Sequence, residues 1–316
     1  MPAFNFSTTG SDLERGFIRY YVAKKPLVVI TGASHGGLGA HTALYLATAN
    51  PAEIILLGRS KEKISPVMKE ISEASPSTIV RFIKIDLMSC ASVSAAAAEI
   101  NATVSKIDVL INNAGIMGVS FALTAENVES HLGANHIGHF LLTNLLVPKL
   151  EASGGARIVN VSSAMYQFSP VLFDDYNFSD GKTYNAWTAY GQSKTANILF
   201  AVALAKKLEK KGINTYSLHP GVIHATGLSA GVDPTAWPIV GSMLESLKME
   251  MPEEKTMEQG CATTLAAALD PALDDQSGSF LNDCNPEKVL YYAYDASNAE
   301  KLWTLSEKIV SEKFSY

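Results

Sequence analysis

Residues 27–39 read Leu-Val-Val-Ile-Thr-Gly-Ala-Ser-His-Gly-Gly-Leu-Gly. A run of branched apolar residues ends in a glycine-rich loop, and the loop leads into a helical pattern over residues 38–50. This order is typical of a dinucleotide site, because glycines let the backbone approach a ligand and a helix N-terminus offers free N–H groups to a pyrophosphate. The alternative is a tight turn that binds no ligand.

The spacing of the glycines is unusual. Gly39 comes one residue later than a Gly-x-Gly ending would place it. We therefore predict one extra residue in the loop, with Ser34 or His35 near a phosphate. The loop residues expected to contact a cofactor are Gly32, Ser34, His35, Gly37, Leu38 and Gly39.

Short apolar runs alternate with helical patterns along the rest of the chain. This alternation predicts an α/β fold with a doubly wound parallel sheet, or Rossmann fold, whose continuous apolar strands are buried on both faces. The expected strands are 27–31, 53–57, 79–85, 109–112, 157–161, 213–218 and 279–281. The expected helices are 38–50, 61–74, 90–104, 125–150, 189–211 and 255–269. We predict a single domain over residues 1–316, with an N-terminal extension over 1–25 and a small substrate-binding lid over 222–256.

Composition narrows the function classes. The 316 residues are 47% hydrophobic and 18% charged, with a net charge of −6 and no basic block, which disfavours nucleic-acid binding. No apolar run reaches the ~18 residues of a membrane span, and no secretion signal is evident. The three cysteines are widely spaced, and His136 and His139, one helical turn apart, have no accompanying Glu. We therefore expect no metal site and a cytoplasmic location.

The residue that follows the second strand helps to predict whether the cofactor is NAD or NADP. NAD binding would call for a carboxylate there, but the chain has Arg59, whose guanidinium suits the 2′-phosphate of NADP. An exposed arginine without a ligand is the alternative. After the third strand, Asp86 and Leu87 are candidates for contact with the adenine, and Asp86 could equally cap a helix.

A further group of residues follows the later strands. Asn113, Ala114 and Gly115 are small or amide residues that would line a cofactor, and Ser162-Ser163 ends a strand at the edge where open α/β sheets bind ligands. Tyr190 and Lys194 lie one helical turn apart, a spacing at which an ammonium would lower the pKa of a phenol and suit it to proton transfer. Each signal is weak by itself.

Together, these motifs in this order resemble the short-chain dehydrogenase/reductases over residues 26–286. The closest resemblance is to the branch of retinol dehydrogenases and WW-domain oxidoreductases. It rests on the segments 135–144, 157–163, 189–197, 219–221 and 277–284, and on the insert 173–178.

The resemblance implies roles for particular residues. Ser163, rather than Ser162, would polarise a substrate oxygen, and Tyr190 would be the general acid or base. Lys194 would lower the phenol pKa and bind the nicotinamide ribose, and Asn135 would hold a water in a proton relay. Cofactor contacts are also expected from Pro220, Gly221, Val222 and Thr226. The family's usual threonine would fall at Ala225, so either Thr226 reaches the phosphates through a shifted loop or that contact is missing.

The expected activity is NADPH-dependent reduction of an apolar or aromatic ketone or aldehyde, or the reverse oxidation. The segment 228–250 is either an apolar lid over the substrate or an amphipathic surface helix. Substrate contacts are expected from Met117, Ser163, Tyr166, His224, Trp237 and Met243. The competing functions are a non-catalytic NADP-binding regulator and a nucleotide-sugar epimerase or dehydratase. The apolar helices around 133–150 and 189–205 could pair in a homodimer or homotetramer, and the absence of a membrane anchor argues against a retinoid-specialised membrane enzyme.

Overall fold

The computed structural model describes residues 4–13, 24–248 and 253–316. Part of the expected N-terminal extension, and four residues of the expected lid, lie outside these ranges. Eight strands form one sheet in the order β3-β2-β1-β4-β5-β6-β7-β8. The strands are β1 (Leu27–Thr31), β2 (Glu53–Gly58), β3 (Ile79–Lys84), β4 (Val109–Asn112), β5 (Arg157–Val161), β6 (Asn214–Leu218), β7 (Phe280–Asn282) and β8 (Asn285–Glu287). All neighbouring strands from β3 to β7 pair in parallel, and β8 is antiparallel to β7. The expected doubly wound sheet is confirmed.

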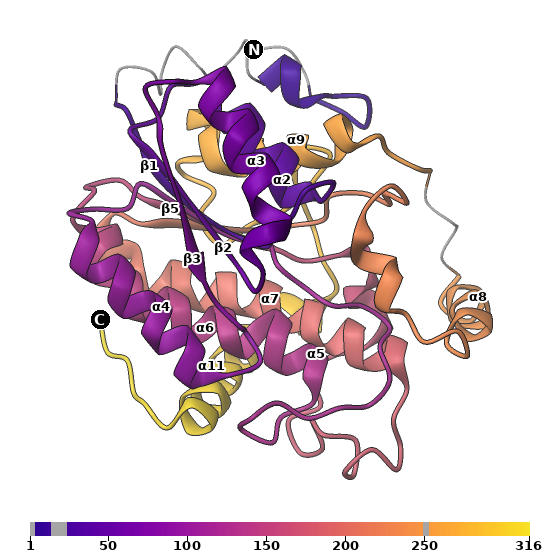
Figure 1. The fold of residues 1–316 in the computed structure, drawn as a ribbon. Helices are drawn as coiled ribbons and strands as arrows, with labels where there is room; N and C mark the ends of the chain where they lie inside the picture. The colour runs from indigo at the N-terminus through magenta and orange to yellow at the C-terminus, as the bar shows by residue number, and fades with distance from the viewer. Residues whose placement is uncertain (1–3, 14–23, 249–252) are drawn as a thin grey trace.

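Helices cover both faces of this sheet (Figure 1). From Leu38 onward the helices are α2 (Leu38–Ala47), α3 (Lys61–Ala74), α4 (Cys90–Thr103), α5 (Ser130–Leu132), α6 (Gly138–Glu151), α7 (Ala186–Leu208), α8 (Trp237–Ser246), α9 (Met257–Leu269), α10 (Tyr291–Tyr294) and α11 (Ala296–Val310). Successive strand residues point to opposite faces, so Val28 packs with α2, α3 and α9 while Val29 packs with α4, α6 and α7. The continuous apolar strands that the sequence shows are explained by these two cores.

The helix predicted over 125–150 begins later than expected. Asn127 has φ +58° in a turn, and Leu123 pairs with Glu129 in an antiparallel bridge, so the chain becomes helical only at Ser130. The Glu129 carboxylate accepts hydrogen bonds from the first N–H groups of α5. A π-helical turn, Gly133–Ile137, then separates α5 from α6. Such turns frequently occur at functional sites, and this one carries Asn135.

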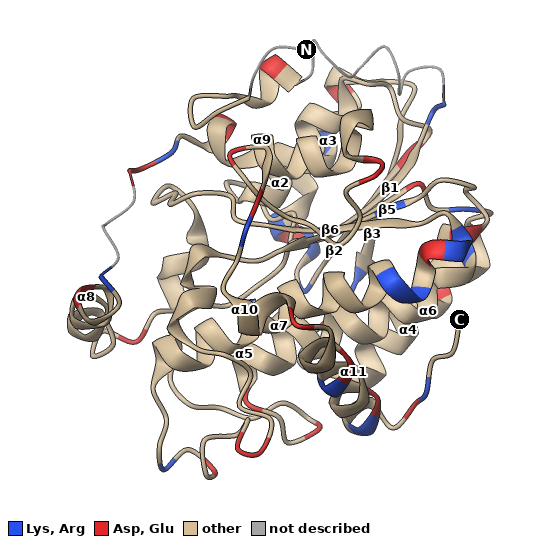
Figure 2. Cartoon of the chain, turned by 180° about the vertical axis from the view of Figure 1, so that it is seen from behind, with Lys and Arg blue, Asp and Glu red and all other residues tan. Residues whose placement is uncertain are grey.

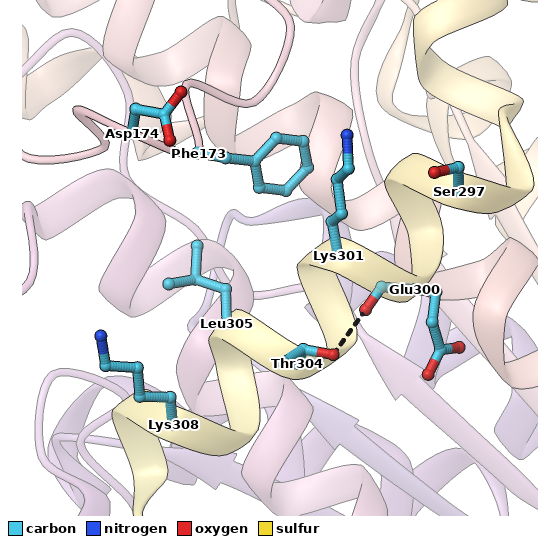
Figure 3. A pocket seen from close by; sticks show the side chains of 8 residues that line it. All are labelled: Phe173, Asp174, Ser297, Glu300, Lys301, Thr304, Leu305 and Lys308. Atoms are coloured by element: carbon cyan, nitrogen blue, oxygen red, sulfur yellow. Dashed lines mark hydrogen bonds between the residues drawn. The ribbon is translucent and has the colours of Figure 1, made fainter.

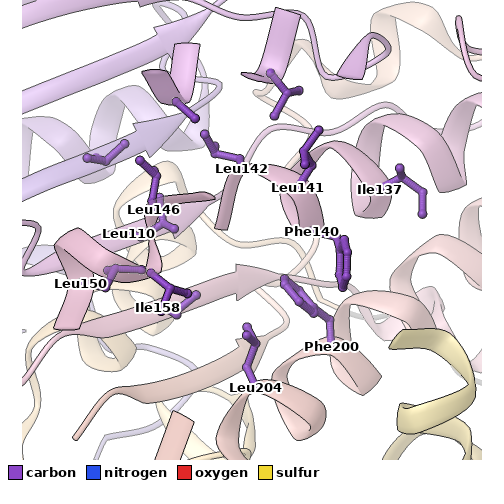
Figure 4. Packing of buried hydrophobic residues seen from close by; sticks show 14 of the residues in the cluster. Leu110, Ile137, Phe140, Leu141, Leu142, Leu146, Leu150, Ile158, Phe200 and Leu204 are labelled. Carbon is purple, nitrogen blue, oxygen red and sulfur yellow. The ribbon is translucent and has the colours of Figure 1, made fainter. Parts of the chain in front are cut away.

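The C-terminal region adds elements that the sequence analysis did not predict. Helix α11 lies along α7 and closes the core on that side, where Trp303 and Phe314 pack on Phe140 with ring centroids 5.0 and 5.7 Å away. Figure 4 shows Phe140 and Phe200 meeting between α6 and α7 beside a row of leucines. The apolar side of α6 and α7, suggested above as a subunit contact, is thus covered in part by the chain itself.

Charged side chains are distributed over the outer helices. In Figure 2, Lys and Arg positions alternate with Asp and Glu positions along the helices and loops in view. Within the ranges that the structure describes, no helix has both the length and the apolar character needed to cross a membrane. The same residues contain no group of three His, Cys, Asp or Glu side chains placed to hold a metal ion.

Candidate active site

Tyr190 and Lys194 lie on α7 behind the carboxyl edge of the sheet. Asn185 caps this helix by accepting from the N–H groups of Trp187 and Thr188, so α7 begins three residues before the expected position. Both side chains are buried, and the Lys194 ammonium lies 5.4 Å from the centroid of the Tyr190 ring. The ammonium also donates to the Val161 carbonyl at 3.0 Å. The structure therefore brings the phenol and the amine together as expected.

The direction of the Tyr190 pKa shift was predicted wrongly. Burial raises the pKa of the phenol to about 12, and the hydrogen bond with Ser163 offsets only part of this rise. Burial also lowers the pKa of Lys194 to about 7. The physical reason is desolvation, which favours the neutral form of each group. The phenol is consequently a protonated donor near neutral pH.

Ser163, and not Ser162, faces the phenol. Ser162 Oγ donates to the Lys194 carbonyl at 2.7 Å, which uses its proton within α7. Ser163 accepts from the Met165 N–H at 3.1 Å and forms a hydrogen bond with Tyr190. One hydroxyl therefore joins the strand to the helix, and the next lies beside the phenol. Polarisation of a substrate oxygen by Ser163 stays a prediction.

Asn135 is buried behind this group. Its side chain binds both main-chain polar groups of Ile116 and donates to Ser193 Oγ at 2.9 Å. Its main-chain carbonyl accepts from His139 Nδ1 at 3.0 Å. Because the side-chain amide is engaged, the predicted water contact would fall to the remaining lone pair of the main-chain carbonyl.

The glycine loop packs directly against the segment after β4. Gly32 has φ +74°, and a Cβ there would lie 2.7 Å from Ala114 Cα; a Cβ at Gly39 would lie 2.5 Å from Asn113 Nδ2. Asn113 donates to the carbonyls of Thr31 and Gly32. Ser34, Gly37 and Leu38 complete the turn into α2, and Gly37 caps that helix without a side-chain acceptor. The N–H groups at the start of α2 are thus left without a side-chain partner.

Thr31 contributes contacts that were not predicted from the sequence. Its hydroxyl accepts from the N–H groups of Asn113 and Ala114 at 2.9 and 3.0 Å and bonds His139 Nε2 at 2.9 Å. The only signal in the sequence was its position directly before Gly32.

The glycine loop contacts α3 through His35. The His35 N–H donates to the Lys63 carbonyl at 2.8 Å, and its ring lies 3.3 Å from the Glu70 carboxylate. Arg59 is exposed after β2 and takes part in no ion pair within residues 4–13, 24–248 and 253–316. Contact of His35 or Arg59 with a phosphate remains a prediction.

Asp86 and Leu87 follow β3. The Asp86 carboxylate accepts from the Met88 N–H at 3.0 Å, whereas the cap of α4 is Ser89, so the expectation that Asp86 caps this helix is wrong. The Leu87 carbonyl lies close under Gly138, where a Cβ would come within 2.6 Å of it. Neither observation tests a contact with adenine.

The turn after β6 rests on a partly buried ion pair that was not predicted from the sequence. Lys255 pairs with Asp283 and lies under Gly221, where a Cβ would come within 2.5 Å of the lysine side chain. Val222 pairs with Glu254, so the two ends of the lid meet here beyond Pro220. The Thr226 hydroxyl accepts a hydrogen bond from the nearby Leu228 N–H at 3.4 Å. Lys255 had no local signal because its partner lies far along the sequence.

Some of the expected substrate contacts come together beside α8, within the segment predicted to be a lid. Met117 and Met243 pack with Trp187, Val232 and other apolar side chains, and the Trp237 ring lies 5.6 Å from that of Trp187. Tyr166 is the exception: the 3-10 turn Ala164–Phe168 directs it to Phe280 and Tyr292, so it belongs to a different cluster. His224 is exposed near the start of the segment predicted to be a lid.

Comparison with known proteins defines the family. The model of the short chain dehydrogenase family matches residues 26–236. The chain belongs to the short-chain dehydrogenases. It is 38% identical to human retinol dehydrogenase 11 over 89% of this chain and 84% of that protein, and 37% identical to human retinol dehydrogenase 12 over the same shares. A crystal structure of an uncharacterised protein from Mycobacterium paratuberculosis is 33% identical, with a TM-score of 0.70 over 92% of this chain and 95% of that one.

A surface groove lies apart from this short-chain dehydrogenase site. It has a volume of about 510 Å³ and runs between α11 and the insert that carries Phe173. Figure 3 shows Lys301 and Leu305 on α11 facing Phe173 across it, with Lys308 at one end. None of its lining residues is among those predicted to contact cofactor or substrate.

Proposed function

We propose that this short-chain dehydrogenase is an NADPH-dependent enzyme that reduces an apolar or aromatic ketone or aldehyde to an alcohol. The observation that carries the proposal is the buried phenol of Tyr190, which is hydrogen-bonded to Ser163 and has the Lys194 side-chain nitrogen 5.4 Å from the centroid of its ring.

The residues present fit a dinucleotide. The start of α2 has no side-chain cap, which suits a pyrophosphate. A Cβ at Gly115 would lie 3.1 Å from Asn135 Oδ1 and 3.6 Å from Lys194 Nζ, so the absence of a side chain keeps the approach to Lys194 open. The loop residues 32–39 would hold the phosphates and Lys194 the nicotinamide ribose. The nicotinamide, when bound, supplies the hydride.

The chain's own residues handle the proton and the charge. Ser163 and Tyr190 donate hydrogen bonds to the carbonyl oxygen of the substrate, which stabilises the negative charge that develops there. The phenol stays protonated at neutral pH because burial raises its pKa to about 12, so it can deliver its proton to the forming alkoxide. Lys194 then favours the phenolate that remains.

Selection of NADPH is assigned to Arg59. Its exposed guanidinium at the end of β2 is free to fork onto a 2′-phosphate. Replacement Arg59→Leu should weaken NADPH binding about tenfold or more, while NADH binding, which involves no 2′-phosphate, stays unchanged and serves as the internal control. Equal loss with both cofactors would contradict the assignment.

The apolar substrate class follows from the side chains under the lid, Met117, Trp187 and Met243. The two human relatives carry the name retinol dehydrogenase, so all-trans-retinal, an aldehyde of retinol, is one of the compounds to test. NADPH oxidation should be measured with that aldehyde, with aromatic and aliphatic ketones, and with nucleotide-sugars. Turnover of nucleotide-sugars alone would overturn the proposal, and so would NADPH binding without turnover of any compound.

Replacement Tyr190→Phe tests the mechanism. The variant should bind NADPH as the wild type does, as followed by fluorescence, and lose turnover by about a thousandfold or more. Activity near that of the wild type would refute the assignment of Tyr190 as the acid.

A further inference from the structure

A buried carboxylate lies behind the Tyr190 ring and has no part in the mechanism above. The Glu129 side chain is fully buried. One of its oxygens accepts from the His131 N–H at 2.9 Å and contacts His131 Nδ1 at 2.8 Å, and the other accepts from the Leu132 N–H at 3.0 Å. Donors therefore surround this carboxylate at the start of α5, and in these contacts it acts as an acceptor.

The carboxylate fixes the tautomer of His131. Because Glu129 acts as the acceptor, the His131 Nδ1 carries the proton. Its Nε2 is then an acceptor, and the Val119 N–H donates to it at 3.4 Å. The same imidazole packs against the Tyr190 ring, with centroids 6.0 Å apart at 68°. One buried side chain therefore touches both the phenol and the segment 116–120, which we call the wall.

Tyr184 also binds the wall. Its hydroxyl donates to the Val119 carbonyl at 2.8 Å and lies 3.2 Å from His131 Nδ1. Burial and the nearby Glu129 raise the pKa of Tyr184, so the phenol keeps the proton that it donates. Both main-chain polar groups of Val119 are thus bound by side chains from outside the wall.

The wall also carries the lid. The Asp233 N–H donates to the Gly118 carbonyl at 2.8 Å, and Ser120 Oγ donates to the Asp233 carboxylate at 2.5 Å. Val232 lies against Gly118, where a Cβ would come within 3.0 Å of it. The position of the lid over Met117 therefore depends on the position of the wall.

We propose that Glu129, His131 and Tyr184 form a positioning cluster that holds the wall and the lid in register with Tyr190 and thereby sets substrate affinity. The inference rests on the proposed function. The cluster touches neither the glycine loop nor Lys194 in any of the contacts above, so it should act on the substrate and leave the cofactor unaffected.

The first test compares three variants with all-trans-retinal and benzaldehyde as probes. His131→Leu removes the acceptor for Val119 but keeps an apolar contact with the Tyr190 ring. It should raise KM about tenfold, change kcat less than threefold and leave NADPH affinity unchanged. His131→Gln restores an acceptor at the same reach and should recover part of the loss.

The matched control is His136→Leu. His136 is an equally buried histidine of the same helical segment, but its Nε2 bonds Ser306 Oγ at 2.8 Å, away from the wall. This variant should lose stability and keep the wild-type KM. If His131→Leu and His136→Leu show the same KM, the cluster is merely structural and the inference is overturned.

Tyr184→Phe and Glu129→Gln test the other two members. Tyr184→Phe loses one hydrogen bond and should raise KM about fivefold, which keeps the inference testable if His131→Leu does not fold. In Glu129→Gln the amide can donate to His131 Nδ1, which moves the ring proton to Nε2, opposite the Val119 N–H. Its effect on KM should therefore disappear in the His131→Leu background, whereas additive effects would contradict a shared cluster.

A readout independent of activity separates this inference from the proposed function. Nitrogen-15 NMR of the His131 ring should show the proton on Nδ1 in the wild type and on Nε2 in Glu129→Gln. A wild-type ring protonated on Nε2 overturns the inference even if the enzyme is active. If the wild type reduces no probe, the proposed function fails and the inference about KM fails with it, even with the expected tautomer.

Discussion

Asn135 holds both main-chain polar groups of Ile116. Its Oδ1 accepts from the Ile116 N–H at 2.8 Å, and its Nδ2 donates to the Ile116 carbonyl at 3.0 Å. The π-helical turn that carries Asn135 is thereby fastened to the segment after β4, on which both the cofactor site and the wall depend.

Replacement Asn135→Ala should be strongly destabilising. It removes three hydrogen bonds and leaves an N–H and a carbonyl of Ile116 without their partner, so we expect a loss of about 2–4 kcal/mol in the free energy of unfolding. Urea denaturation measures it. The control Asn101→Ala removes one bond to the Leu145 carbonyl and should cost about 1 kcal/mol. Equal losses in the two variants would contradict the role of the double contact.

NADPH affinity should depend on the hydroxyl of Thr31 and not on its methyl group. Thr31→Val keeps the shape but leaves the N–H groups of Asn113 and Ala114 without their acceptor. We expect NADPH affinity to fall about tenfold, measured by fluorescence titration. Thr31→Ser keeps the hydroxyl and should bind almost as the wild type does. Similar affinities for the valine and serine variants would show that the hydroxyl is unimportant.

Gly39 should not tolerate a side chain. The Cβ of alanine would meet Asn113 Nδ2 at 2.5 Å and the Gly32 carbonyl oxygen at 2.8 Å, so the loop or the segment after β4 must move. We expect Gly39→Ala to lower the free energy of unfolding by about 1–3 kcal/mol and to weaken NADPH binding. Gly227→Ala is the control, because nothing lies within 4 Å of its Cβ. Wild-type behaviour of Gly39→Ala would mean that this contact relaxes freely.

The burial of Lys194 should lower the free energy of unfolding at low pH. Its pKa falls from 10.5 to about 7 on folding, so below pH 7 the folded state carries a buried charge that the unfolded chain leaves in water. The destabilisation is complete below pH 7 and fades as the pH rises toward 10.5. Lys194→Met should therefore raise Tm at pH 6 by about 2 °C or more, with no gain near pH 10.5. Lys69→Met, at an exposed position of α3, should show no such trend.

The contact between Asp233 and Ser120 should slow the opening of the lid. Bonds from Ser120 and Thr235 hold the pKa of the Asp233 carboxyl at about 2, so it is charged at neutral pH. Asp233→Ala should accelerate amide exchange over residues 232–246 about fivefold, as followed by mass spectrometry. Ser120→Ala removes the same bond from the other side and should act in the same direction. Unchanged exchange in both would show that other contacts hold the lid.

Several features could be predicted from the sequence because their signals are local. The β-branched run before Gly32 and the helical pattern after it are contiguous in the chain, and Tyr190 and Lys194 share one helix. Two neighbouring serines could also be distinguished by resemblance, and the structure shows why they differ: Ser162 bonds the Lys194 carbonyl and Ser163 the Tyr190 phenol.

Other features depend on residues that are distant in sequence. Lys255 forms an ion pair with Asp283, and the Thr31 hydroxyl forms hydrogen bonds with the segment after β4 and with His139. No local sequence pattern predicts either set of contacts. Tyr166 carries an aromatic ring close to Ser163, yet the 3-10 turn sends it to another cluster. The start of the helix before Asn135 was predicted too early because Asn127 adopts a turn there.

The amino-acid sequence by itself determined the order of the strands and of the main helices as far as β7, the glycine loop and the pairing of a phenol with an amine one turn away, because these follow from periodicity and spacing along one chain. Only the tertiary structure decided that the phenol is a weaker acid than usual and that His131 joins it to the wall. Both depend on how completely distant segments exclude water from Tyr190, and that exclusion exists only once the chain has folded.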